Sequence, residues 1–107
     1  MEAYVVCFIT VDTMENAVKI ASSLVEEKIV ACVNIIPKIR SIYRWEGKIF
    51  DENESFMIAK TRASLIDTLR TRVRELHPYE IPEIIFLDIS NGFEGYLNWI
   101  DDCTRIS

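Results

Sequence analysis

The sequence predicts an α+β fold in which one four-stranded antiparallel sheet carries two helices on the same face. Three observations support this prediction. Strand and helix patterns follow each other in the order strand, helix, strand, strand, helix, strand. A turn signal at residues 45–48 joins the two middle strands into a long hairpin, and prolines separate the second helix from the last strand. The length of 107 residues is typical of one domain, so we treat residues 1–107 as a single unit.

The first two elements are a buried strand and an amphipathic helix. Residues 4–11 are almost all apolar, β-branched or aromatic, which is typical of a strand buried on both faces. Asp12 or Thr13 is suited to an N-cap, and Asp12 with Glu15 has the spacing of a capping box. A helix ending near Lys28 is then predicted from apolar residues that recur at helical spacing: Ala17, Ile20, Ala21, Leu24 and Val25.

The sequence pattern of residues 31–60 predicts a hairpin of two long strands. Residues 31–43 form a long extended segment, and Pro37 within it marks an edge, a bend or a bulge because proline cannot donate to a sheet ladder. Gly47, within the turn at residues 45–48, can adopt a positive φ. The return strand covers residues 49–60. A hairpin of this length projects beyond a small domain.

The second helix is predicted over residues 63–76, with Ser64 and Asp67 as start signals. It ends at His77, because the residue before Pro78 is pushed out of the α region. Its buried stripe is Ile66, Leu69, Val73 and Leu76.

The chain then predicts a last strand over residues 83–89 and a turn at residues 91–92. A short C-terminal helix follows, and its apolar stripe is Phe93, Leu97 and Ile100.

These elements predict a ferredoxin-like βαββαβ sandwich with an extra C-terminal helix. Right-handed crossovers place both long helices on one face of the sheet, with the strand order 4-1-3-2. Residues 4–9 and 84–87 carry apolar side chains on both faces, and the short last helix can hide only part of the second face. Monomers rarely leave such a patch in water, so we expect a closed homo-oligomer with sheets packed face to face.

Composition limits the range of functions. The formal net charge of -5 argues against nucleic acid and anionic membranes as partners. The sequence contains no stretch of about 18 apolar residues that could span a membrane. Met1-Glu2-Ala3 lacks the basic start of a secretory signal. A soluble, cytoplasmic protein is therefore expected. Three cysteines without a C-x-x-C pair do not predict a disulfide framework, and Cys7 and Cys32 are expected to be buried apolar residues.

Residues 77–82 are the most informative stretch, because they hold the only histidine and two of the three prolines. The junction places the His77 imidazole, the Tyr79 phenol and the Glu80 carboxylate on one short turn. These groups bind metals or form hydrogen-bonded networks. Equally, a histidine at a helix C-terminus often acts only as a cap.

Two other functions of this fold fit the sequence poorly. An acylphosphatase needs a backbone cradle and an arginine for phosphoryl oxygens, but residues 11–14 contain no glycine and place Asp12 against an incoming anion. RNA recognition needs exposed aromatic residues with basic flanks, which the chain lacks.

Five motifs in order resemble the CutA family of divalent-cation tolerance proteins. They lie at residues 31–34, 43–48, 60–61, 77–83 and 96–100. The resemblance covers nearly the whole chain. It implies a homotrimer similar in architecture to PII signalling proteins, an association with copper and divalent-cation tolerance, no enzymatic activity and no required cofactor.

The resemblance also implies site residues. Some bacterial members have a copper site of one first-strand cysteine and two adjacent histidines. Here His77 matches the second histidine, Leu76 stands at the first, and Cys7 lies two residues from the cysteine position near Ile9. Weak copper binding by His77, Cys7 and Glu80 is therefore expected.

The remaining expectations concern contacts between subunits. A cleft between subunits is expected to involve Arg44, Trp45, Lys60, Tyr79 and Glu80, and the interface to include Tyr43, Trp45 and Trp99. The Lys60 amine needs a carboxylate or ligand partner, and Glu80 or Glu83 is suited to that role. The alternative function is a PII-like sensor or adaptor that binds a small anion in the clefts through Lys60 and Arg44.

Overall fold

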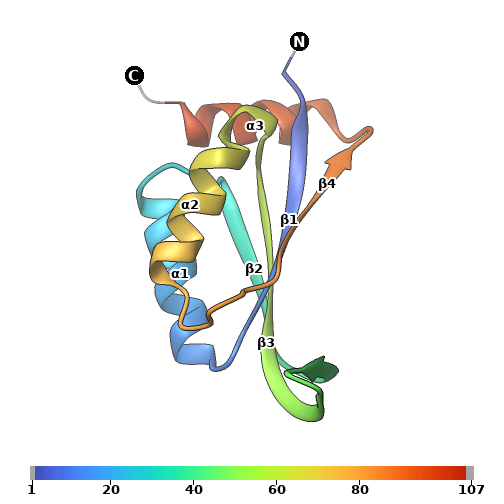
Figure 1. Cartoon of the computed structure of the whole chain (residues 1–107). Coiled ribbons are helices and arrows are strands. Elements are labelled where there is room, and N and C mark those ends of the chain that lie inside the picture. Colours follow the sequence, from blue (N-terminus) through green and yellow to red (C-terminus); the bar gives the residue numbers. More distant parts are fainter. Residues whose placement is uncertain (1, 106–107) are drawn as a thin grey trace.

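A computed structural model describes residues 2–105 and has the predicted order of elements, shown in Figure 1. The elements are β1 (Tyr4–Val11), α1 (Met14–Glu26), β2 (Cys32–Trp45), β3 (Lys48–Arg62), a 3-10 turn η1 (Ala63–Leu65), α2 (Ile66–Leu76), β4 (Ile84–Ile89) and α3 (Glu94–Thr104).

The four strands form one antiparallel sheet in the order β2-β3-β1-β4, which confirms the predicted order. Helices α1 and α2 cover one face of this sheet, and α3 lies across one end of the sheet (Figure 1). Helix α3 binds the opposite face at that end, because the Tyr4 hydroxyl donates to Asp101 Oδ2 at 2.6 Å and Cys32 Sγ lies 3.5 Å from the Tyr96 oxygen. The sheet therefore has a covered face and a partly open one.

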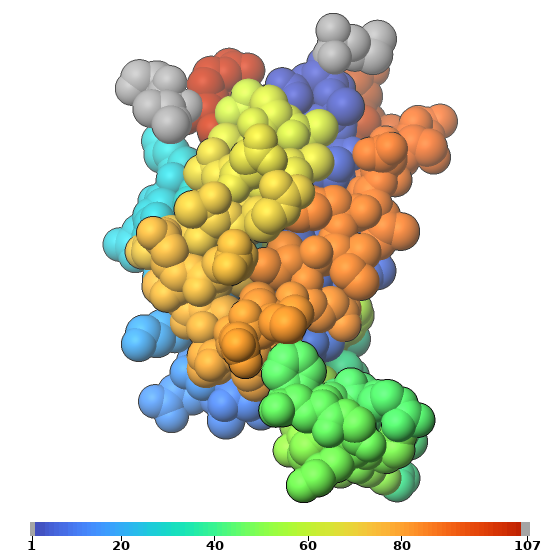
Figure 2. Space-filling model, viewed as in Figure 1, coloured from blue at the N-terminus to red at the C-terminus, as the bar shows by residue number. Residues whose placement is uncertain are grey.

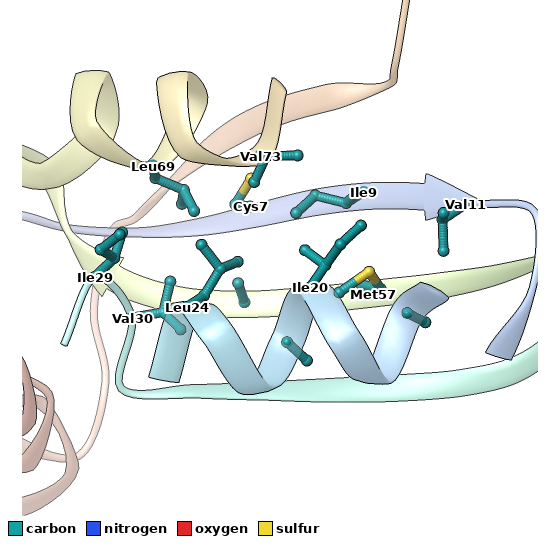
Figure 3. Close-up of a cluster of buried hydrophobic side chains, with 13 residues drawn as sticks. Cys7, Ile9, Val11, Ile20, Leu24, Ile29, Val30, Met57, Leu69 and Val73 are labelled. Carbon is teal, nitrogen blue, oxygen red and sulfur yellow. The ribbon is translucent and has the colours of Figure 1, made fainter. Parts of the chain in front are cut away.

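The hydrophobic core lies between the sheet and helices α1 and α2 (Figure 3). Alternate residues of β1 point into it, as the period of two along a strand requires. Cys7 and Ile9 are fully buried there, against Leu24 of α1 and Leu69 and Val73 of α2. Each large side chain buried in this way contributes about 1.5–3 kcal/mol to the stability of the chain.

Helix α1 begins and ends for local reasons. Of the two proposed N-caps, Thr13 is the one used: its side-chain oxygen accepts from the Asn16 backbone N–H at 3.1 Å. The helix ends at Glu26, two residues before the predicted end. Lys28 already has a φ of 62°, a left-handed conformation that a helix cannot contain.

The β2–β3 hairpin extends well past the rest of the domain (Figure 1), and the molecule measures 45 × 25 × 22 Å. The register shifts between Ile36 and Ile39, so Pro37 lies at a bulge. The tip is a two-residue turn in which Glu46 and Gly47 both have positive φ.

Two predicted helix starts are wrong in detail. Residues 63–65 form a 3-10 turn, so α2 begins only at Ile66 and has no side-chain cap bond, although Asp67 lies in its first turn as a start signal does. The chain is instead held there by the Ala63 N–H, which donates to the Ala3 carbonyl at 2.8 Å. Phe93 was expected in the stripe of the last helix, but it precedes α3 with extended backbone and is 81% exposed. Ile100 is buried as predicted.

The sheet face opposite α1 and α2 remains apolar. Because paired residues point to the same face, the register assembles rows of side chains across the strands. One row contains Ile85, Phe8 and Ile58, and the next contains Phe56 and Ile36. Ile85 is 50% exposed and Leu87, on the same face, is 46% exposed. We call this surface the open face. Among residues 2–105, no helix is long and apolar enough to cross a bilayer.

Candidate functional site

His77 lies at the C-terminal end of α2, where the chain turns toward β4. Its backbone is extended, as a residue before proline requires, and its N–H closes the helix by donating to the Val73 carbonyl at 2.8 Å. The side chain is only 7% exposed. His77 is therefore the predicted helix cap, and its side chain is also a buried polar group.

Both ring nitrogens of His77 already have partners. Nε2 lies 2.7 Å from the Thr10 carbonyl oxygen, which can only accept, so Nε2 carries the proton. Nδ1 accepts from the Tyr79 backbone N–H at 3.1 Å. Burial lowers the pKa of His77, and this favours the neutral ring that the two bonds define. The ring thus joins β1 to the α2–β4 connection, and it has no free lone pair for a metal.

Tyr79 extends this network to the hairpin. Its hydroxyl donates to Glu54 Oε2 on β3 at 2.9 Å, and its ring lies 4.7 Å from the His77 ring, centroid to centroid. Burial and the bond to Glu54 raise the pKa of Tyr79, so the phenol stays protonated and keeps donating. Glu54 is 8% exposed, and among the described residues Tyr79 is the only one that donates a hydrogen bond to its carboxylate.

A hollow of about 590 Å³ opens beside this network, between the hairpin and residues 79–83. In Figure 2 the green hairpin residues lie directly below the orange residues around position 80. Aromatic rings and carboxylates line the hollow, among them Tyr43, Trp45, Tyr79, Glu54, Glu80 and Glu83. None of the lysines and arginines that the structure describes lines it. Burial, and then the negative charge of Glu54, raise the pKa of Glu83. The hollow therefore favours positive charge.

The three expected metal ligands do not form a site. Cys7 is in the core on the helix side of the sheet, and burial raises the pKa of its thiol to about 12. A protonated, buried thiol is not a ligand. His77 has both nitrogens occupied, and Glu80 is exposed at the rim of the hollow. Within residues 2–105, no group of three histidine, cysteine or acidic residues is placed to hold an ion. The donor set does not fit a preformed copper site.

Lys60 and Arg44 are far apart within one chain. Lys60 lies on the open face and donates to Asn34 Oδ1, rather than to Glu80 or Glu83 as expected. Arg44 pairs with Ile49 near the tip of the hairpin. Since Ile49 is eleven residues from Lys60 on β3, the two cations are separated by about 35 Å of extended strand. One chain cannot bring them onto the same anion.

The expected interface residues lie on exposed parts of the structure. Tyr43 stacks on Phe50 with ring centroids 5.5 Å apart, and its hydroxyl donates to Glu52. Trp45 is half-buried beside the hollow, and Trp99 lies exposed on α3. Their role in contacts between subunits stays a prediction.

Two residues of this site were not identified from the sequence. Thr10 takes part through its backbone carbonyl oxygen, which accepts from His77. Every residue has such an oxygen, so the sequence does not single out Thr10. Glu54 ends a run of polar residues at positions 51–54, but it shares a strand face with Phe56 and Ile58. That alternation was the available signal, because a carboxylate in phase with apolar residues is expected to be partly buried.

Comparison with known proteins identifies the family. Residues 5–103 match the family described as CutA1 divalent ion tolerance protein. The chain belongs to this family. It is 44% identical to the divalent-cation tolerance protein CutA of Thermus thermophilus, over 92% of this chain and 96% of that protein. It is 45% identical to chloroplastic CutA of Arabidopsis thaliana over 94% of this chain, and it spans only 56% of that protein's length.

Solved CutA1 structures have the same fold. The crystal structure of CutA1 from Oryza sativa superimposes with a TM-score of 0.94 at 43% identity, covering 98% of this chain and 96% of the other. A CutA structure from Archaeoglobus fulgidus, described as periplasmic, gives 0.90 at 38% identity, covering 98% and 100%. The names of these relatives place CutA1 proteins in different compartments, so a cytoplasmic location of this chain stays a prediction.

Proposed function

We propose that this CutA1 family member acts as a non-enzymatic homotrimer that contributes to tolerance of divalent cations, copper among them. Family membership over residues 5–103 is the observation that carries the proposal. The open face supports the assembly, because a surface with Ile85 and Leu87 half exposed is unusual for a monomer. The PII-like architecture and the cytoplasmic location are parts of the same proposal.

Copper is proposed to bind weakly, without a preformed site. Binding at His77 would require the loss of its bond to Thr10 or to Tyr79, and Cys7 would have to leave the core as a thiolate. Titration of copper by calorimetry is expected to give a weak affinity that the substitution His77→Ala changes little. Tight binding that this substitution abolishes would contradict this part of the proposal.

Cell growth and mass measurements test the proposal as a whole. A bacterium lacking its own CutA1 member should grow better in raised copper when it expresses this chain. Light scattering should give about 37 kDa, three copies of the 12.4 kDa chain. Unchanged growth would contradict the role in tolerance, and a mass near that of one chain would contradict the trimer.

A further inference from the structure

The hollow beside Glu54 is suited to one class of small molecule. Glu54 is buried, and only its Oε2 accepts a hydrogen bond, from Tyr79. Its other oxygen has no partner within residues 2–105 but is still accessible, since no fully enclosed polar atom there lacks a hydrogen bond. Glu54 itself is one of the residues that line the hollow. A buried carboxylate without a cation is costly, and a ligand that supplies one relieves that cost.

The rest of the lining selects the kind of cation. Tyr43, Trp45 and Tyr79 offer aromatic faces, which attract organic ammonium groups through the charge distribution of their rings. Glu80 and Glu83 are exposed and add negative charge at the rim. An inorganic divalent ion would need several converging oxygen ligands, and no such group is present among residues 2–105. The arrangement therefore favours a flexible chain with more than one amine.

We propose that this hollow binds an aliphatic polyamine. One ammonium group donates to the free oxygen of Glu54, and the methylene stem lies along Trp45 and Tyr43. A second ammonium group is neutralised by Glu80 and Glu83 at the rim. This inference does not rest on the copper proposal, because it uses a different ligand. Glu54 shares a strand face with Phe56 and Ile58 of the open face, so the inference requires the hollow to stay accessible in the assembled protein.

Isothermal titration of the assembled protein with spermidine, in about 0.15 M salt to screen diffuse attraction, tests the inference. Saturable binding with one site per chain is expected. The diol 1,6-hexanediol, which has a similar stem without charge, and Mg²⁺, which has charge without a stem, should bind at least tenfold more weakly. Equal binding of Mg²⁺ would indicate general attraction to an acidic protein and would overturn the proposal.

Matched variants separate this hollow from the overall negative charge. Glu54→Gln should weaken spermidine binding about tenfold or more, the usual effect of losing a hydrogen bond to a charged group. Glu26→Gln removes the same charge from an exposed position on α1 and should change the affinity less than twofold. Equal effects of the two substitutions would contradict the assignment.

Trp45→Leu provides a second test that leaves Glu54 in place. Trp45 lies near the exposed tip of the hairpin, so the variant should fold even if Glu54→Gln does not. Its affinity should fall severalfold through loss of the ring. If Trp45→Leu binds spermidine as well as the wild type, the proposal fails. It also fails if the assembled wild type shows no saturable binding. That result would indicate that a neighbouring copy closes the hollow. A growth defect in copper is a separate readout, so the two proposals can fail independently.

Discussion

At the scale of single residues, His77 has a structural role that depends on pH. Its pKa in the folded chain is below the ordinary value of 6.5, so the unfolded chain takes up a proton at higher pH than the folded chain does. The neutral ring therefore contributes its full stability above about pH 6.5, and this contribution is lost as the pH falls from there. Asp12 and Glu54 oppose this loss, because their negative charges favour the protonated ring.

His77→Gln tests this role. Glutamine can still donate to the Thr10 carbonyl, but it does not replace the acceptor of the Tyr79 N–H. We expect a loss of about 1–3 kcal/mol near neutral pH from one unsatisfied buried group. Urea unfolding at about pH 7.5 and about pH 5.5 should show a smaller loss of stability on acidification in the variant than in the wild type. Parallel losses in both proteins would show that His77 does not sense this pH change.

Cys7 gives a second prediction at this scale. Because it is fully buried and its pKa is raised to about 12, it should not react with iodoacetamide in the folded protein. Mass spectrometry of protein alkylated in denaturant should find it labelled, and Cys7→Ala should remove that one site without changing the native pattern. Rapid native labelling of Cys7 would show that it is accessible, and would reopen its role as a ligand.

The sequence predicted residues better when their role was local. The end of α2 at His77 follows from Pro78 alone, and the structure confirms it. The bonds from His77 to Thr10 and from Tyr79 to Glu54 join residues 67 and 25 positions apart. Such contacts depend on how the sheet and the hairpin fold together, so no local pattern predicts them.

At the scale of elements, the hairpin is defined by its turn and its bulge. Gly47 has a φ of 76°, and a Cβ added there would contact nothing within 4 Å. Gly47→Ala should therefore cost about 1–2 kcal/mol, from backbone strain alone. The control is Glu46→Gly, since Glu46 has a φ of 49° and should gain stability when its side chain is removed. Urea unfolding at one protein concentration would measure both, and equal destabilisation would contradict a turn that requires two positive φ values.

Elements were predictable where apolar periodicity is strong, and their ends were less so. The strands, the sheet order and both long helices follow from alternation, from helical spacing and from the handedness of crossovers. Phe93 was assigned to the wrong environment because it has the spacing of the Ile100 stripe, although the helix begins only at Glu94. Spacing alone does not show where a helix starts when no side chain caps it.

At the scale of the whole molecule, the two faces of the sheet differ in what covers them. Helices α1 and α2 complete one face, and α3 covers the other only at one end. The sequence predicts this imbalance, because the strands next to α3 are apolar on both faces. It does not predict how copies of the chain are oriented in the proposed homotrimer, since the apolar pattern of one chain specifies no symmetry.

Leu87→Glu tests whether the open face is an interface between copies. A charge at the centre of a packed apolar interface should be strongly unfavourable, so the variant should dissociate in light scattering and lose stability. Val18→Glu is the matched control: Val18 is 45% exposed, close to the 46% of Leu87, but it lies on α1, away from the open face. The control should keep the mass of the wild type. If both variants keep that mass, or both lose it, the open face is not what holds the copies together.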